Sequence, residues 1–478
     1  MLFSVYTLGC KLNQLETEAI TGSFCREGFA FVPWSGAARG SAEPWLMVVN
    51  TCTVTSMAEQ KARRFIRKLL REHPAMCVII TGCYAQMEQS ALSALEPTAS
   101  FPGRLFVIPG ESKDRLLDLP GFLAGAAQAT LPGLIASWLQ SLSPGSFSQG
   151  QEDGAFRLQP EDFASHSRAF LKIQDGCDRR CAYCRVSLAR GKSRSLGAEE
   201  ALAVLKSLEE RGFAEAVIAG VNITQYRDAR GVELAGLLGF LLSNTGAIRL
   251  RLSSIEPDWL IQDRALDLTQ ALAHPRIRPH FHLSVQSGSA GVLAKMGRLY
   301  APQDIEKAVA LLRSVRGDPF VACDIIAGFP GETEEDFEKT VALCQSVGFA
   351  WIHAFPFSPR PGTAAYGFTE RVSEKTAAKR VEQLTALARK GRRQYIDRWK
   401  GKEVEAIVES GKDAGQRMIP AVSENYLKLL VDCGKGPAPA PGSRIRCRIL
   451  CEQLPENSRF DAMACESLLD CPGPQSVV

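Results

Sequence analysis

The chain has 478 residues, of which 45% are hydrophobic and 23% are charged, a balance typical of a soluble globular protein with two or three domains. Its net charge of only +4 excludes a strong overall field, so any nucleic-acid binding must come from local patches. No apolar run reaches membrane-spanning length and no signal peptide is recognisable, so we expect a cytoplasmic protein without membrane contact. The 15 cysteines indicate metal or redox chemistry rather than a disulfide framework.

Residues 1–110 alternate apolar runs with amphipathic stretches, which predicts an N-terminal α/β domain with a doubly wound parallel sheet. The expected strands are 2–8, 45–49, 78–81 and 105–108, and the expected helices are 12–27 and 58–72. Cys10, Cys52 and Cys83 each follow one of the first three strands. They therefore lie at the carboxyl edge, where open α/β sheets build their sites, and can converge on one ligand. The alternative is three unrelated cysteines, because free cysteine is often a small core residue.

Residues 111–166 are rich in Gly, Pro, Ser, Ala and Gln, and we expect a linker with one or two short helices there. Residues 167–400 then repeat a strand–helix pattern six times. Expected strands are 170–173, 216–220, 248–252, 281–285, 321–326 and 351–355, and expected helices are 199–211, 233–243, 263–273, 302–315, 334–346 and 373–400. Six such units predict a central open (β/α)6 partial TIM barrel with its site at the strand carboxyl ends.

Three cysteines occupy the loop after the first of these strands, with the spacing Cys177-x3-Cys181-x2-Cys184. A zinc ribbon uses Cys-x2-Cys pairs and four ligands, and no fourth Cys or His lies close in the sequence. Three thiolates on a four-iron cubane leave one iron without a protein ligand, which is the property of a catalytic rather than a closed structural site. The alternative is a structural metal knuckle or a chance cluster of cysteines.

The C-terminal region alternates short strands at 404–408, 426–431 and 444–449, so we expect a small β-barrel over residues 401–455 and an unassigned tail over 456–478. Two basic features precede it. One is the stretch 190–195, and the other is the helix 373–400 with nine Lys and Arg residues between Lys375 and Lys400. A basic helix is usually only solvated, but such a stripe can also bind phosphates without reading sequence.

The loop with Tyr183 before its last cysteine resembles the signature of radical S-adenosylmethionine (SAM) enzymes. The stretches 6–14, 50–55 and 81–86 resemble the three cysteine motifs of the methylthiotransferase N-terminal domain, and residues 401–455 resemble the RNA-binding TRAM domain of that family. The resemblance implies two [4Fe-4S] clusters. Cys177, Cys181 and Cys184 would hold the cluster whose open iron binds and cleaves SAM, and Cys10, Cys52 and Cys83 would hold an auxiliary cluster that carries the donated sulfur.

Strand ends of the central region also resemble those of a methylthiotransferase core. SAM requires acceptors at its ribose, a guanidinium or amide at its carboxylate and a groove for adenine. The candidates for these contacts are Asn222, Ser254, Glu256, Gln286 and Arg298. Each of them could instead stabilise a loop.

The resemblance implies a transferase of sulfur-containing groups that converts a C–H bond into C–S–CH3. Gly9–Gln14 and Asn50–Thr55 resemble the branch that acts at C2 of N6-threonylcarbamoyladenosine at position 37 of tRNA, forming the 2-methylthio derivative ms2t6A. The alternatives are the N6-isopentenyladenosine branch, the branch that modifies an aspartate of a ribosomal protein, and, from another class, a non-catalytic metal-containing RNA-binding protein. The expected partners are tRNA and a reductant protein such as flavodoxin or ferredoxin.

Two positions depart from the family pattern. Arg185-Val186-Ser187 replace an apolar residue, Ile and Pro after Cys184, and Thr224 stands where Gly is frequent. We expect the first change to alter the SAM loop or the substrate entrance, although neither change removes a ligand.

Overall fold

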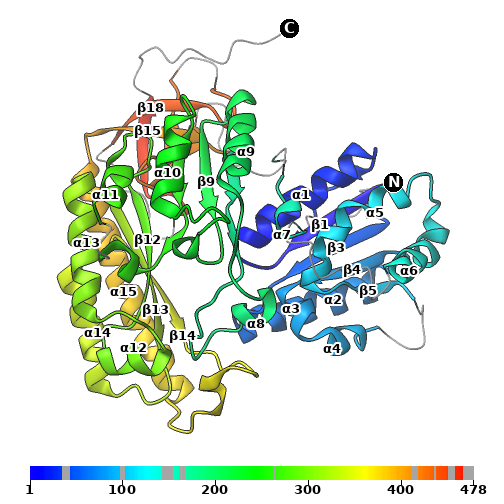
Figure 1. Cartoon of the computed structure of the whole chain (residues 1–478), viewed down its shortest axis with the longest axis horizontal. Helices are drawn as coiled ribbons and strands as arrows, with labels where there is room; N and C mark the ends of the chain where they lie inside the picture. The colour runs from blue at the N-terminus through cyan, green and yellow to red at the C-terminus, as the bar shows by residue number, and fades with distance from the viewer. Residues whose placement is uncertain are drawn as a thin grey trace. The chain divides into compact units, whose positions relative to one another are not determined.

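The computed structural model describes residues 1–34, 43–96, 103–142, 154–160, 163, 167–261, 265–410, 418–434, 438–450 and 458–466. Two compact units make up the chain (Figure 1). The first contains residues 1–164, 174–194 and 358–363, and the second contains residues 165–173, 195–357 and 364–478. No helix among the described residues is long and apolar enough to cross a membrane.

The first unit is built on a parallel sheet with the strand order β2-β1-β3-β4-β5. Its elements are β1 (Leu2–Thr7), α1 (Lys11–Arg26), β2 (Ala30–Phe31), β3 (Leu46–Thr51), α2 (Ser56–Glu72), β4 (Cys77–Gly82), α3 (Cys83–Met87), α4 (Gln89–Ser93) and β5 (Leu105–Val107). Successive side chains of a strand point to opposite faces. Val48 therefore packs in one apolar core with Ile20 of α1, and Val49 packs in the other with Ile66 of α2. Helices on both faces confirm the doubly wound prediction.

The segment expected to be a linker packs against the same unit. It contains η1 (Gly110–Leu117), α5 (Leu119–Phe122), η2 (Gln128–Thr130), α6 (Leu131–Ser141) and α7 (Gly154–Arg157). Leu131, Ile135 and Trp138 join the core that contains Phe3. Their spacing places them on one helix face, a signal that the Gly- and Pro-rich composition of the surrounding sequence obscures. Residues 143–153 of this segment lie outside the described residues.

The second unit contains two parallel sheets in chain order, β6-β9-β10 and β11-β12-β13-β14. Their strands are β6 (Ala169–Lys172), β9 (Glu215–Ala219), β10 (Arg249–Leu252), β11 (Ser254–Ile255), β12 (His280–Gln286), β13 (Phe320–Ala327) and β14 (Trp351–Pro356). Only Ser253 separates β10 from β11. The six predicted strands are all present, in an α/β arrangement whose described strands do not close into a ring.

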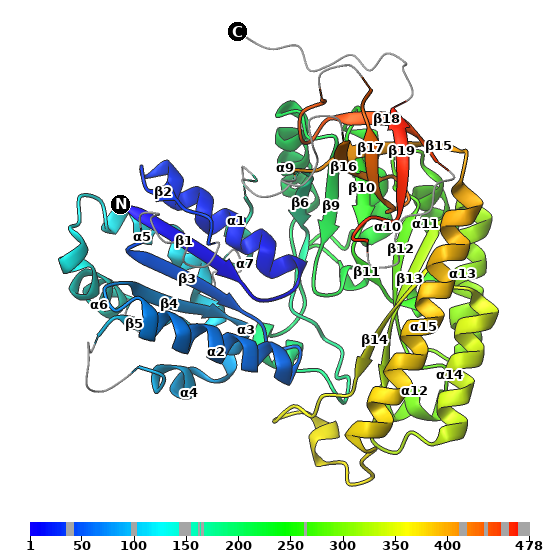
Figure 2. The ribbon, with the colours of Figure 1, turned by 180° about the vertical axis from the view of Figure 1, so that it is seen from behind.

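Helices follow these strands (Figure 2), and among the described residues the six helices that the apolar spacing predicts are joined by four shorter ones that it does not predict. They are α9 (Ala198–Glu210), η3 (Ile223–Gln225), α10 (Leu234–Ser243), η4 (Pro257–Ile261), α11 (Ala265–Ala273), α12 (Ala290–Met296), α13 (Pro302–Arg316), α14 (Glu334–Val347), η5 (Ala364–Gly367) and α15 (Glu374–Trp399). Helix α14 begins at a capping box in which Thr333 accepts from the backbone N–H of Asp336, so Thr333 starts a helix.

The C-terminal strands of the second unit form a closed barrel in the order β15-β16-β17-β19-β18, as Figure 2 shows. They are β15 (Glu403–Val408), β16 (Met418–Ser423), β17 (Lys428–Asp432), β18 (Arg444–Ile449) and β19 (Ala462–Glu466). The small β-barrel is confirmed, but it takes its last strand from the region expected to be a tail. Strand β19 pairs with β17 and β18 and places Ala462 and Ala464 in the core. Two alanines give too weak an apolar alternation to predict a strand.

Candidate iron–sulfur and SAM site

Three thiols far apart in sequence lie at one edge of the N-terminal sheet. Cys10 precedes α1 directly after β1, Cys52 follows β3, and Cys83 begins α3 at the end of β4. Burial, together with the negative charge of Cys10 and Cys83, raises the pKa of Cys52 to about 12. The structure therefore brings the three thiols within electrostatic reach of one another. It also leaves them in need of positive charge if all three are to be thiolates.

Cys10 differs from the other two because it keeps contact with solvent, whereas Cys52 and Cys83 are buried. Protein atoms around its sulfur still disfavour the thiolate and raise its pKa, while the nearby Arg190 lowers it. One accessible and two buried thiols fit a group that is held at the sheet edge and open on one side.

Gly82 fixes the position of Cys83. Its φ of +98° lies in the region that favours glycine, and a Cβ there would lie 2.2 Å from the backbone oxygen of Thr51. No other residue fits this approach of β4 to β3. The packing of β4 against β3 therefore requires a glycine directly before Cys83.

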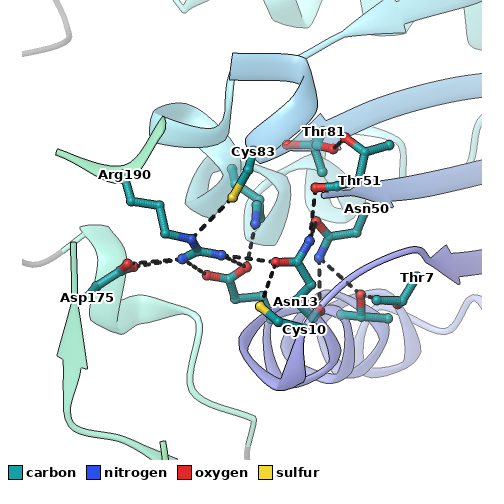
Figure 3. A network of polar contacts seen from close by, with 12 residues as sticks. Thr7, Cys10, Asn13, Asn50, Thr51, Thr81, Cys83, Asp175 and Arg190 are labelled. Carbon is teal, nitrogen blue, oxygen red and sulfur yellow. Dashed lines mark hydrogen bonds and ion pairs between the residues drawn. The ribbon is translucent and has the colours of Figure 1, made fainter. Parts of the chain in front are cut away.

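Arg190 is the last residue of α8 (Val186–Arg190), the short helix after the Cys177–Cys184 loop, and it reaches the thiol site (Figure 3). Its Nε donates to the sulfur of Cys83 at 3.3 Å. Its other nitrogens donate to Glu16 at 2.8 Å, Asp175 at 3.0 Å and Asn13 at 3.1 Å. Burial opposes the charge of Arg190, but Asp175, Cys83 and Glu16 outweigh it and hold the pKa of the guanidinium well above its usual value.

The Cys177–Cys184 loop is tied at its base and leaves its thiols half-buried. The N–H of Cys177 donates to the carbonyl of Gly191 at 3.0 Å, and the N–H of Cys184 donates to the carbonyl of Cys181 at 3.1 Å. The N–H of Val186 donates to the sulfur of Cys184 at 3.4 Å. A backbone donor aimed at a sulfur stabilises a thiolate ligand, so the loop suits a metal centre that remains accessible from one side.

Within the described part of the chain, no group of three or more His, Cys, Asp or Glu residues could hold a metal ion as it stands. A single ion requires all its ligands at about 2.0–2.6 Å from one point. The thiolates of a [4Fe-4S] cubane bind different irons and do not meet at one point. Three thiols that are close but not convergent therefore remain compatible with a cluster of this kind.

Arg185, which stands where the family pattern has an apolar residue, belongs to a buried ion cluster. Arg185 donates to Glu88 at 2.9 Å and to Glu59 of α2 at 3.4 Å. Arg360 also pairs with Glu59 and donates to Thr53 at 2.9 Å. The arginine that replaces an apolar residue next to Cys184 thus shares one carboxylate with Arg360, beside Cys52. Glu59 is a residue that the sequence analysis missed, because a single Glu in the first turn of a helix is usually only a favourable charge there.

Two of the residues proposed to contact SAM lie together in the second unit. Glu256 and Arg298 form a buried ion pair at 3.2 Å, and Arg298 also donates to the Tyr300 hydroxyl at 2.9 Å and to the Ser284 carbonyl at 3.1 Å. A buried, oriented guanidinium near a strand end suits a cofactor carboxylate.

The other three candidates have different surroundings. Gln286 is buried at the carboxyl end of β12 with a φ of +69°, a strained conformation of the kind that concentrates at functional sites. Asn222 accepts from the N–H of Thr224 at 3.2 Å and so stabilises its own turn. Ser254 is half-buried on β11, which pairs with β12.

The basic features are only partly available to a ligand. The side chain of Arg190 is 8% exposed and ion-paired, so it does not present a charge to phosphates. On α15, Arg380 is buried against Glu332 and Arg392 pairs with Asp461. The exposed basic residues of α15 are Lys375, Lys379, Arg389, Lys390, Arg393 and Arg398.

Comparisons with known proteins agree with these features. The model of the radical SAM superfamily matches residues 171–344, and that of the uncharacterized protein family UPF0004 matches residues 3–102. The threonylcarbamoyladenosine tRNA methylthiotransferase MtaB of Treponema pallidum is 40% identical, covering 94% of this chain and 98% of the relative. MtaB of Thermotoga maritima is 34% identical, covering 85% and 86%. The tRNA-2-methylthio-N(6)-dimethylallyladenosine synthase of Chlorobaculum tepidum is 30% identical, covering 87% and 88%.

Proposed function

Because the chain belongs to the radical SAM tRNA methylthiotransferase family, we propose that it replaces the C2–H bond of N6-threonylcarbamoyladenosine at position 37 of tRNA with C–S–CH3. The observation that carries the proposal is the 40% identity to a threonylcarbamoyladenosine tRNA methylthiotransferase over 98% of that relative. The dimethylallyladenosine synthase is a more distant match at 30%, which ranks that substrate second.

This reaction requires cofactor chemistry because the C2–H bond offers neither a leaving group nor an acidic proton to an acid–base catalyst. When bound, SAM and two [4Fe-4S] clusters supply the electron, the radical, the sulfur and the methyl group. We assign Cys177, Cys181 and Cys184 to the cluster that binds SAM, and Cys10, Cys52 and Cys83 to the auxiliary cluster. The tied loop, the Val186 N–H on Cys184 and the edge position of the N-terminal thiols support these assignments.

The chain's other residues would hold the ligands in place. The pair Glu256–Arg298 would orient SAM through its charged groups, with Gln286, Asn222 and Ser254 around it. The C-terminal barrel and α15 would hold the tRNA by its phosphates, with sequence selection left to the modified base. A flavodoxin or ferredoxin would deliver the electrons, and the reaction would take place in the cytoplasm.

The substrate assignment is tested by mass spectrometry of tRNA nucleosides from cells that lack the protein. We expect the 2-methylthio derivative of N6-threonylcarbamoyladenosine to disappear and to return with the wild-type chain but not with Cys177→Ala. Loss of the 2-methylthio derivative of isopentenyladenosine instead would move the chain to the second substrate. Unchanged 2-methylthio nucleosides would contradict a tRNA substrate.

The cofactor assignment is tested by anaerobic iron and sulfide analysis. Two cubanes contain about eight irons and about eight sulfides per chain, and removing all three thiols of either set should halve both numbers. A colourless protein that contains zinc would instead support the non-catalytic RNA-binding alternative.

A further inference from the structure

The contact between Arg190 and Cys83 joins residues 107 positions apart. Cysteines can bind a cluster without such a contact, so its presence calls for another explanation. The Nε–H donates to the sulfur at 3.3 Å, so the contact is a hydrogen bond from a cation to a proposed iron ligand. Figure 3 shows the guanidinium between Cys83 on one side and acidic groups on the other.

Arg190 is held in this orientation by partners on several sides. Glu16 and Asp175 accept from Nη1, and Asn13 accepts from Nη2. Glu16, which is 1% exposed, also pairs with the buried Lys113. Two cations and two carboxylates thus balance within the network, and Nε is the nitrogen directed at the sulfur. A buried charge with this many partners has little freedom to turn away.

The same guanidinium contacts the surroundings of both cysteine sets. Asn13 and Glu16 belong to the first turns of α1, which begins directly after Cys10. Asp175 precedes Cys177 by two residues, and its carboxylate accepts from the N–H of Gly176 at 2.7 Å. Arg190 therefore links the position of Cys83 to α1 and to the start of the SAM-cluster loop.

We propose that Arg190 is a positioning residue of the auxiliary cluster that also tunes its reduction potential. This inference rests on the proposed assignment of Cys10, Cys52 and Cys83 to that cluster. Reduction adds one negative charge to the cluster, and a hydrogen bond from a cation to a ligand sulfur stabilises the reduced state more than the oxidised one. Arg190 thus raises the potential at which the auxiliary cluster accepts an electron.

The test uses the full-length chain with Cys177, Cys181 and Cys184 changed to Ala, so that only the auxiliary cluster is present. The cluster is reconstituted anaerobically, and its midpoint potential is measured by an EPR-monitored redox titration. Arg190→Gln removes the charge, and Arg190→Lys keeps the charge without the planar fork. The matched control is Arg104→Gln, which removes another buried arginine of the same unit. Arg104 donates to the carbonyls of His73 and Met76, at the edge of the sheet opposite the cysteines.

We expect Arg190→Gln to lower the midpoint potential, so that the ratio of reduced to oxidised cluster at a fixed potential falls about tenfold, or about 59 mV for a one-electron couple. Arg190→Lys should lie between Arg190→Gln and the parent, and Arg104→Gln should keep the parent's potential. Equal potentials and iron contents in Arg190→Gln and Arg104→Gln would overturn the role of Arg190.

Two further results separate the inference from its premise. If the parent variant binds no cluster, the assignment of the auxiliary cluster is wrong and the inference falls with it. If Arg190→Gln does not fold, Arg190→Lys decides, since an unchanged potential in a variant that binds about four irons would overturn the inference.

Discussion

Gly176, which directly precedes Cys177, shows how one residue can set the geometry of the SAM-cluster loop. Its φ is +72°, and a Cβ at this position would lie 1.9 Å from the backbone oxygen of Lys192. The oxygen belongs to the backbone, so it cannot move aside as the end of a flexible side chain could. The first cysteine of the loop can keep its position only if the residue before it has no side chain.

Gly176→Ala should therefore disrupt the SAM-cluster loop while leaving the N-terminal thiols in place. We expect iron per chain to fall from about eight to about four, with loss of SAM cleavage. The control is Gly212→Ala, where φ is +83° but no atom lies within 4 Å of the added Cβ. That variant bears only the backbone cost of about 1–2 kcal/mol and should keep its iron. A full complement of iron in Gly176→Ala would contradict this account of the loop.

Helix α15 presents an exposed basic stripe at the scale of a single element. Lys375, Lys379, Arg389, Lys390 and Arg393 recur at helical spacing, so they share one face of the helix, and all five are exposed. Arg380 and Arg392 lie off this face and are used in ion pairs. The division follows from burial, because arginines that face the core need carboxylate partners while those that face water do not.

The stripe predicts a salt-dependent contribution to tRNA binding. The double variant Arg389→Glu with Lys390→Glu should weaken binding and reduce the slope of log K against log salt by about 0.7–0.9 for each phosphate that the protein no longer neutralises. Fluorescence anisotropy at several salt concentrations measures both quantities. The control is Lys206→Glu on α9, another exposed lysine. If both variants bind tRNA equally well, α15 is only a solvated helix.

At the scale of the whole molecule, a buried ion network within the second unit joins the central sheet to the C-terminal barrel. Glu215 of β9 pairs with Arg251 at 2.6 Å and with Arg278 at 2.7 Å, and Arg278 also pairs with Glu405 of β15 at 2.6 Å. Burial alone would raise the pKa of Glu215, but the two guanidinium groups outweigh it and lower that pKa to about 2. The barrel is therefore attached through charges that are removed from water.

Glu215→Gln should destabilise the second unit by about 3–5 kcal/mol at pH 7, because it removes the buried carboxylate that Arg251 and Arg278 share. Since the folded pKa lies below the unfolded value of about 4.3, the contribution is complete above that pH. It is lost as the pH falls toward 2. Urea denaturation of the iron-free chain between pH 8 and pH 3, followed by circular dichroism, measures this difference.

A solvent-exposed ion pair of the barrel provides the control for that experiment. Glu403 pairs with Arg448 at 3.0 Å, and the two side chains are 45% and 57% exposed. Glu403→Gln should therefore cost less than about 1 kcal/mol at any pH. A difference between wild type and Glu215→Gln that grows below pH 4 would contradict the sign of this prediction.

Local patterns in the sequence determined the α/β repeats, three strands of the C-terminal barrel and the family, because period, turn residues and cysteine spacing act over short distances along the chain. They also placed the three N-terminal cysteines at strand ends, since parallel strands share one carboxyl edge. Tertiary structure decided the rest. Whether α6 packs on the core, whether Ala462 and Ala464 complete a barrel, and which carboxylates meet Arg185 depend on residues far apart in sequence. The contact of Arg190 with Cys83 also depends on tertiary structure. A single charged residue gives no repeating pattern in the sequence, and its partner is decided by which groups are buried beside it in the folded chain.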